Sequence, residues 1–183
     1  MTAGREPVSR TKDWCTPPEY VTAAREALGG RIHFDPCSNK HSVVGADVEL
    51  MPPVADGLKS DWNYPTIYVN PPYGRCARPA GAAAKTRSTI KDWLRKCSEA
   101  RAAYDSEIVA LVPVATNTSH WQQYVFTATA ICFLKVPRLK FMLDGEAVGK
   151  GAPMSCAVIY WGGDLGRFRH AFAKFGAVLA TGV

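Results

Sequence analysis

The chain has 183 residues, of which 47% are hydrophobic and 21% charged, and its formal net charge is +6. This length favours one domain with a substantial core, and the composition excludes a disordered chain. No apolar run reaches the ~18 residues that a membrane span needs, and the start lacks the apolar core of a signal peptide. The six cysteines form no CxxC pair, so neither a zinc site nor a disulfide framework is expected. We therefore expect a cytoplasmic protein whose positive charge favours a polyanionic partner.

The N-terminal region predicts a flexible arm followed by a helix. Residues 1–13 are polar and basic, and we expect them to precede a single domain over residues 14–183. Thr16-Pro17-Pro18-Glu19 then predicts a helix start, with Thr16 as the cap, Pro17 at the first helical position and Glu19 completing a capping box. Gly29-Gly30 predicts the end of this helix.

The rest of the chain alternates between strand and helix patterns. Short apolar runs predict strands at 32–35, 67–69, 108–112, 130–134, 138–143 and 155–161, and the last two are expected to form the end of the sheet. Helices are expected near 90–103, 119–128 and 164–175, the last followed by a terminal strand, whereas 36–66 predicts loop with short elements. This alternation predicts an α/β fold, with a mostly parallel central sheet, helices on both faces, an antiparallel edge, and ligands at the carboxyl ends of the strands.

Asn70-Pro71-Pro72-Tyr73 follows the strand expected at 67–69. The two prolines fix φ, remove two N–H donors and hold the preceding residues extended, so the backbone here is stiff. The result is a rim that presents the Asn70 amide, main-chain carbonyls and the Tyr73 ring to one cleft. Such a rim suits a planar substrate that carries an amino group, although the motif alone could equally be a Pro-rich turn. Asp35 follows the strand at 32–35 and is expected at the same sheet edge.

Several sequence blocks occur in a characteristic order. They are Trp14-x-Thr16-Pro17-Pro18-Glu19, Phe34-Asp35-Pro36-Cys37-Ser38, Asp56-Gly57-Leu58 with Trp62, and Asn70-Pro71-Pro72-Tyr73-Gly74, followed by Leu111-Val112-Pro113, Arg138-Leu139-Lys140-Phe141 and Ala157-Val158-Ile159. In order and spacing this set resembles the small phage-type DNA N6-adenine methyltransferases, over roughly residues 14–161. The resemblance implies a Rossmann-like methyltransferase fold, S-adenosylmethionine (SAM) as methyl donor, no metal, and DNA as partner.

The resemblance also implies a role for each block. The cofactor-binding residues would be Trp14, Thr16, Pro17, Asp35, Pro36, Cys37, Ser38 and Asp56. The catalytic residues would be Asn70, Pro71, Pro72 and Tyr73. Here the Asn70 side-chain and Pro71 main-chain carbonyls would hold both hydrogens of the adenine amine, and Tyr73 would stack on the base. One departure is that Pro36-Cys37-Ser38-Asn39 lacks the Gly-rich turn usual in methyltransferases, and Asp35 could simply be a turn former.

Contacts to the DNA are expected from aromatic and basic residues around the motif. The substrate-binding residues would be Tyr73, Arg75, Arg87, Lys91, Arg95, Arg138, Lys140 and Phe141. Basic side chains would contact phosphates, and Phe141 would form a second wall for a flipped adenine. The alternatives are a solvated helix face for the basic stretch and a core position for Phe141.

Two other functions remain open at this point. The same motif serves protein glutamine N5-methyltransferases, whose substrate is also a planar amide nitrogen. A non-catalytic nucleic-acid-binding module on the same fold is the second alternative. Tyr73 followed by Gly74 would leave a flat surface wide enough for a purine, which favours adenine over cytosine. The recognition sequence, the preference for single or double strands, and a monomeric or dimeric state are not predicted.

Overall fold

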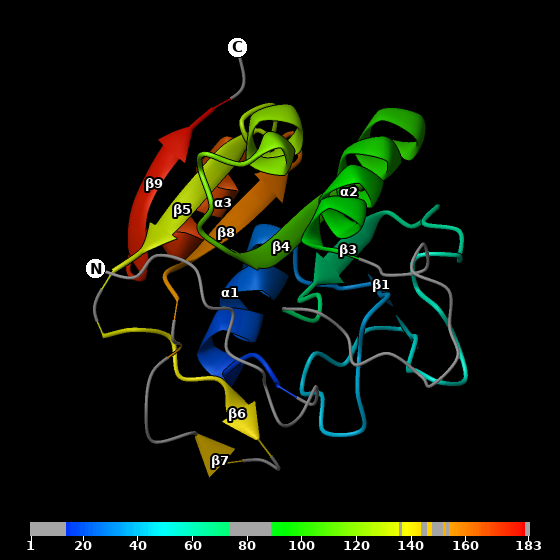
Figure 1. The fold of residues 1–183 in the computed structure, drawn as a ribbon. Helices are drawn as coiled ribbons and strands as arrows, with labels where there is room; N and C mark the ends of the chain where they lie inside the picture. The colour runs from blue at the N-terminus through cyan, green and yellow to red at the C-terminus, as the bar shows by residue number, and fades with distance from the viewer. Residues whose placement is uncertain are drawn as a thin grey trace.

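The computed structural model describes residues 14–73, 89–135, 137–143, 146–147, 152 and 154–181. The expected arm at residues 1–13 lies outside this part of the chain. Its centre is a seven-stranded sheet in the order β2-β1-β3-β4-β8-β5-β9 (Figure 1). The strands are β1 (Phe34–Asp35), β2 (Val48–Glu49), β3 (Thr66–Val69), β4 (Glu107–Pro113), β5 (Ala130–Leu134), β8 (Cys156–Trp161) and β9 (Gly176–Ala180). A separate hairpin pairs β6 (Met142–Leu143) with β7 (Glu146–Ala147).

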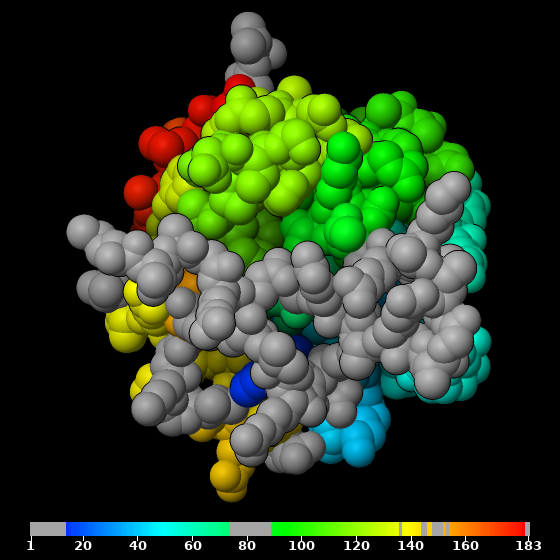
Figure 2. Space-filling view, in the orientation of Figure 1, coloured from blue at the N-terminus to red at the C-terminus, as the bar shows by residue number. Residues whose placement is uncertain are grey.

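Helices cover both faces of the sheet, as the sequence predicts. Figure 1 shows α2 (Ile90–Tyr104) in front of the sheet, and α1 (Pro18–Ala27) and α3 (Leu165–Phe172) behind it. A short π-helix, η1 (Trp121–Val125), lies within the expected helix at 119–128 and packs on the same face as α2. One core cluster joins α1 and α3 to Tyr68, and the second joins α2 and η1 to Trp62. In Figure 2, α2 and η1 form the upper part of the visible surface, and β9 lies at its left margin.

The sheet combines a parallel core with an antiparallel part. β2, β1, β3 and β4 run parallel, whereas β8 is antiparallel to both β4 and β5, and β9 is antiparallel to β5. The expectation that 155–161 ends the sheet is wrong, because β8 lies between β4 and β5. All six β8 residues are buried, and a strand that is apolar on both faces belongs inside a sheet.

The strand expected at 138–143 is also mostly wrong. Only Met142–Leu143 is extended and paired, and it joins β7 rather than the main sheet. Arg138 and Lys140 are exposed, and such charged side chains disfavour a place within the sheet. Met142 instead exchanges two backbone hydrogen bonds of 2.9 Å with Cys15, which joins this segment to the chain before α1.

The expected start of α1 is displaced by one residue. Pro17 is the N-cap and Pro18 the first helical residue, and no side chain caps the helix. The Thr16 hydroxyl bonds to Tyr68 instead, so the predicted cap and capping box are wrong. The predicted stop is confirmed, because Gly29 and Gly30 take φ values of 78° and 99° after the helix, which glycine adopts without strain.

Strand order creates a crevice between β1 and β3. The chain leaves β1 toward β2 on one side, and it leaves β3 through α2 toward β4 on the other side. Neighbouring parallel strands whose connections diverge leave an opening at their carboxyl ends, where α/β proteins bind ligands. In the part of the chain that the structure describes, no helix combines the length and apolar character that crossing a membrane requires.

Candidate active site

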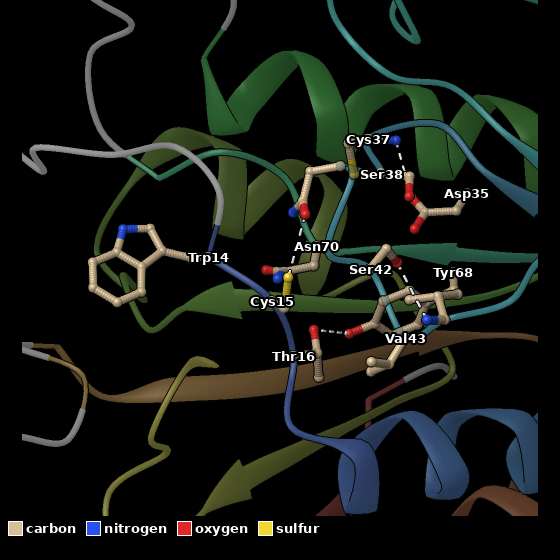
Figure 3. A pocket seen from close by; sticks show the side chains of 12 residues that line it. Trp14, Cys15, Thr16, Asp35, Cys37, Ser38, Ser42, Val43, Tyr68 and Asn70 are labelled. Carbon is tan, nitrogen blue, oxygen red and sulfur yellow. Dashed lines mark hydrogen bonds between the residues drawn. The ribbon is translucent and has the colours of Figure 1, made fainter. Parts of the chain in front are cut away.

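A small cavity lies at the carboxyl ends of β1 and β3, facing the segment before α1 (Figure 3). Its volume is about 20 Å³, the room that a water molecule takes. Six of the residues that the sequence assigns to cofactor or catalysis line it, namely Trp14, Thr16, Asp35, Cys37, Ser38 and Asn70. The structure therefore brings together three segments that are far apart in the sequence.

Asp35 is the buried acid of this cavity. Its side chain is 3% exposed, and Oδ1 accepts a 3.0 Å hydrogen bond from the Cys37 amide. The Cys37 thiol is a second hydrogen-bond donor to this carboxyl. The pKa of Asp35 is raised from 3.8 to about 7, mainly because the carboxyl is buried; the bonds from Cys37 lower the pKa, and the charge of Glu49 adds to the increase. A buried carboxylate that has no cationic partner among the described residues favours a cationic group of a ligand.

Glu49 belongs to this site, although the sequence analysis did not identify it. The residue ends β2, directly beside Asp35 in the parallel register. Its Oε2 accepts a 3.0 Å bond from the Ser38 hydroxyl, and its Oε1 accepts a 3.1 Å bond from the Ala46 amide. These bonds tie the loop after β1 to the end of β2. A two-residue strand carries too little pattern to be recognised, so no sequence signal pointed to Glu49.

Asn70 presents an unused amide to the same cavity. Its side chain is half-buried and makes no hydrogen bond to any described residue, so its carbonyl can accept from a ligand. Pro71 is buried, which keeps the chain after β3 in place. The Cys37 thiol lies against the Asn70 backbone, and burial raises the pKa of this thiol well above its usual value. The loops after β1 and β3 are therefore in contact at the cavity.

Three aromatic rings pack together, with Phe141 in contact with both Tyr73 and Trp14. Tyr73 donates a 2.8 Å hydrogen bond from its hydroxyl to the Leu111 carbonyl of β4, and its ring lies edge-on to Phe141 at 5.6 Å. Trp14 lies 6.4 Å from Phe141 on the other side, and Figure 3 shows its indole directed away from Asp35. Phe141 is only 7% exposed and packs on Tyr73, so it takes the core position that was the alternative to a wall for the base.

Asp56 does not line this cavity. Its Oδ1 accepts from the Leu58 amide at 3.1 Å, and its Oδ2 lies 3.3 Å from Lys59. The next residue, Gly57, packs directly on the Pro36 carbonyl, where an added Cβ would come within 1.9 Å of the oxygen. Asp56 therefore lies on the outer side of the loop after β1, and Pro36 of that loop separates it from the cavity.

The basic residues expected to contact DNA are spread over several elements. Lys91 and Arg95 are exposed on α2, where Arg95 pairs with Glu99 at 2.8 Å. Arg138 and Lys140 are exposed beside Phe141. Arg75 and Arg87 lie outside the described residues. Among the described residues, no group of three or more His, Cys, Asp or Glu side chains is placed to hold a metal ion.

An acid and an amide at the switch point of the α/β sheet place the protein in the class of α/β domains that bind a ligand at the carboxyl ends of their strands. The family described as DNA N-6-adenine-methyltransferase (Dam) matches residues 4–165, and the chain belongs to this family. It is thus a DNA adenine methyltransferase with a Rossmann-like fold that uses SAM. The glutamine methyltransferase and the non-catalytic module are set aside by this assignment. Searches of curated proteins and of solved structures gave no match.

The polar groups of the cavity fit the methionine end of SAM. That end carries an ammonium and a carboxylate, so it needs an anionic acceptor and a neutral or positive donor. Asp35 supplies a buried carboxylate, and Thr16 supplies a hydroxyl from the facing segment. The turn Pro36-Cys37-Ser38-Asn39 directly after β1 contains no glycine, but Pro36 is buried and packed against Gly57, so this turn is held by packing.

Proposed function

We propose that Asn70 and Pro71 hold the adenine amine for methyl transfer in this enzyme. The observation that carries the proposal is the free Asn70 amide, half-buried at the cavity and without a hydrogen-bond partner among the described residues. An amine with two hydrogens needs two acceptors to fix its direction. The Asn70 side-chain carbonyl and the Pro71 main-chain carbonyl are adjacent in the chain, and the prolines hold both in place.

These acceptors explain how a poor nucleophile reacts. The lone pair of the adenine amine is delocalised into the ring, so the amine must be oriented and its developing positive charge stabilised. Two carbonyl oxygens accept both amine hydrogens and do so more strongly as charge builds up on the nitrogen. The bound SAM supplies an electrophilic methyl group on sulfur. The chain therefore needs no nucleophilic side chain of its own.

Tyr73 would supply the stacking surface for a flipped base. Removing a base from the duplex costs a few kcal/mol, and stacking on an aromatic ring returns roughly 1–3 kcal/mol per base. Because the hydroxyl of Tyr73 is bonded to Leu111 and its edge packs on Phe141, the ring is fixed before the base arrives. Phe141 then acts mainly by holding Tyr73 in position, with Pro72 keeping the backbone stiff between them and Asn70.

The cofactor would lie over the loop after β1. Asp35 binds its ammonium, Thr16 and Pro17 border its methionine end, and Cys37 and Ser38 form the floor. Pro36 supports these two residues from below, and Trp14 lies at the rim of the cavity. Asp56 and Glu49 act from behind this loop rather than by direct contact. Since the substrate is DNA, we also infer that the enzyme works in the cytoplasm of a bacterial or phage-infected cell.

Asn70→Ala tests the proposal directly. It should lower kcat for methyl transfer by at least 100-fold, because an acceptor that acts mainly in the transition state is worth roughly 3 kcal/mol. The affinity for SAM, measured by calorimetry, should change less than about three-fold. Asn63→Ala is the matched control, because Asn63 is exposed and outside the cavity. Nucleoside analysis of treated DNA should show N6-methyladenine, and transfer by Asn70→Ala within a few-fold of wild type would refute the role of Asn70.

A further inference from the structure

Two buried hydroxyl groups meet at the wall of the cavity. The Thr16 Oγ1 and the Tyr68 hydroxyl oxygen are 2.6 Å apart, and the two residues are 3% and 2% exposed (Figure 3). Both residues line the cavity that also contains Asp35 and Asn70. Thr16 comes from the segment before α1 and Tyr68 from β3, so this bond joins two walls of the site.

A count of protons shows that the pair is incomplete. Each hydroxyl carries one proton, and the bond between them uses one of the two. Neither oxygen has a second hydrogen-bond partner among the residues that the structure describes. Among the described residues, one hydroxyl proton therefore has no acceptor, whichever residue donates to the other. A buried donor without a partner is costly, so a cavity that contains one is matched to a ligand that brings an acceptor.

The surroundings of the pair favour an anionic acceptor. Helix α1 begins two residues after Thr16 and runs for ten residues, and the start of a helix attracts negative charge. Pro17 and Pro18 carry no N–H groups, so a hydroxyl replaces the donors that a helix start ordinarily offers. Asp35 provides the opposite pole in the same cavity. A ligand group with one positive and one negative end, such as an amino acid, fits this pair of poles.

We propose that the Thr16–Tyr68 hydroxyl pair binds the carboxylate of the cofactor's methionine end, with Tyr68 acting as a cofactor-positioning residue. The inference rests on SAM as the cofactor of this family. Tyr68 precedes Asn70 by two residues, about 7 Å along an extended chain. The same strand then fixes the methyl donor through Tyr68 and the methyl acceptor through Asn70. A small displacement of the donor relative to the acceptor is costly for transfer, so this shared support has a catalytic consequence.

The test compares two ligands that differ only in the carboxylate, SAM and decarboxylated SAM, by calorimetry on the full chain. Wild-type protein should bind SAM at least about ten-fold more tightly, since a hydrogen bond to a charged group is worth roughly 1.5–3 kcal/mol. The double variant Thr16→Val with Tyr68→Phe should lose this preference, binding SAM about ten-fold more weakly and decarboxylated SAM within two-fold of wild type. Of the two single variants, the one with the larger loss identifies the hydroxyl that faces the ligand.

Tyr64→Phe, the same change at a tyrosine outside the cavity, is the control and should leave both affinities unchanged. If the double variant bound both ligands more weakly by the same factor, the proposal would be overturned. The substitutions would then have disturbed the site as a whole and not an interaction with the carboxylate. No preference for SAM in the wild-type protein would overturn it without any variant, so a failure to fold cannot hide the answer. The role of Asn70 is independent of these results, since it is read from kcat on DNA.

Discussion

Asp35 and Glu49 lie opposite each other in parallel register at the carboxyl ends of β1 and β2. Glu49 accepts hydrogen bonds from Ser38 and Ala46, whereas Asp35 accepts only from Cys37 among the described residues. The burial of Asp35 and, to a lesser extent, the charge of Glu49 disfavour the ionised form of Asp35, which is why its pKa rises to about 7. The cofactor site is thus partly protonated near neutral pH and becomes negatively charged when a cation enters.

Binding of SAM should therefore depend on pH through Asp35. An ammonium group favours the ionised carboxylate, so affinity should increase as pH rises from about 6 to 8, through the raised pKa. At pH 7 and below, binding should also release a proton. Calorimetry in buffers of different ionisation enthalpy measures this release. Asp35→Asn keeps an acceptor for the Cys37 amide, and it should lower affinity and remove the pH dependence in this range.

The raised pKa of Asp35 affects the stability of the protein in the opposite direction to SAM binding: stability should decrease as pH rises. A carboxyl whose pKa is higher in the folded than in the unfolded protein favours folding when protonated. The contribution of Asp35 is therefore full below pH 3.8 and is lost as pH rises to about 7. Without ligand, Asp35→Asn should raise the thermal midpoint at pH 8 relative to wild type and change it little near pH 4. A lower midpoint for the variant at pH 8 would mean that the buried charge has a stabilising partner.

Gly57 should be required for cofactor binding although it does not line the cavity. A Cβ at this position would come within 1.9 Å of the Pro36 carbonyl oxygen, and Trp62 Nε1 holds the Gly57 carbonyl at 2.8 Å. Since Gly57 cannot move away, Gly57→Ala should displace the loop after β1 and weaken SAM binding about ten-fold or more. Gly163→Ala is the control, because its Cβ would meet nothing closer than 4.0 Å. Equal affinities for both variants would show that this loop does not bind the cofactor.

Two substitutions of Tyr73 should separate its ring from its hydroxyl. Tyr73→Phe removes the bond to the Leu111 carbonyl, which is worth about 1 kcal/mol of stability, and keeps the stacking surface. It should lower the thermal midpoint while kcat/KM for DNA stays within a few-fold. Tyr73→Ala removes the ring and should lower kcat/KM by roughly 10–100-fold, in line with 1–3 kcal/mol for stacking. If both variants transfer methyl groups equally well, the flipped base does not stack on Tyr73.

On α2, Lys91 should contact DNA more than Arg95 does. Lys91 is in the first turn of α2, which begins on the cleft side of the sheet, and makes no ion pair with any described residue. Arg95 is engaged by Glu99 at 2.8 Å. Lys91→Ala should weaken DNA binding and reduce the slope of log K against log salt by about 0.9 for one phosphate contact. Arg95→Ala, the matched control, should leave the slope unchanged, and a reversed order of the two effects would contradict this assignment.

Local patterns in the sequence predicted most helices and strands, because each pattern acts over a few residues. The apolar runs of β3, β4 and β5 and the glycines after α1 are of this kind. Long-range choices were not predictable. The Thr16 hydroxyl turns away from α1 because Tyr68, 52 residues later, offers it a buried partner. β8 lies in the middle of the sheet because both of its faces are apolar. Its neighbours in the sequence do not indicate which strands it pairs with.

For the residues of the active site too, local motifs were predictable and long-range contacts were not. Asn70, Asp35 and Thr16 were predicted from motifs at strand and helix ends, and the structure brings them to one cavity. Phe141 was predicted either as a second wall for a flipped adenine or as a core residue, and it is buried against the ring of Tyr73. Glu49 and Tyr68 were not predicted. Glu49 belongs to the site because its strand pairs with the strand of Asp35, and Tyr68 belongs to it because its hydroxyl bonds to Thr16, which lies far away in the sequence. For Tyr68 a faint signal existed, because it is the aromatic residue within an otherwise aliphatic buried run.

The two edges of the sheet differ in a way that matters for handling the protein. The edge next to the cofactor cavity is β2, a strand of two residues, whereas the far edge is β9, with five residues and no charged or proline side chain. Leu179 on β9 is 53% exposed. Such an edge strand can pair with the edge of another molecule. At high concentration, we therefore expect the molecules to associate through β9 rather than through the edge beside the cavity. Placing a lysine on this strand, as in Leu179→Lys, should keep the enzyme dispersed without changing its affinity for SAM.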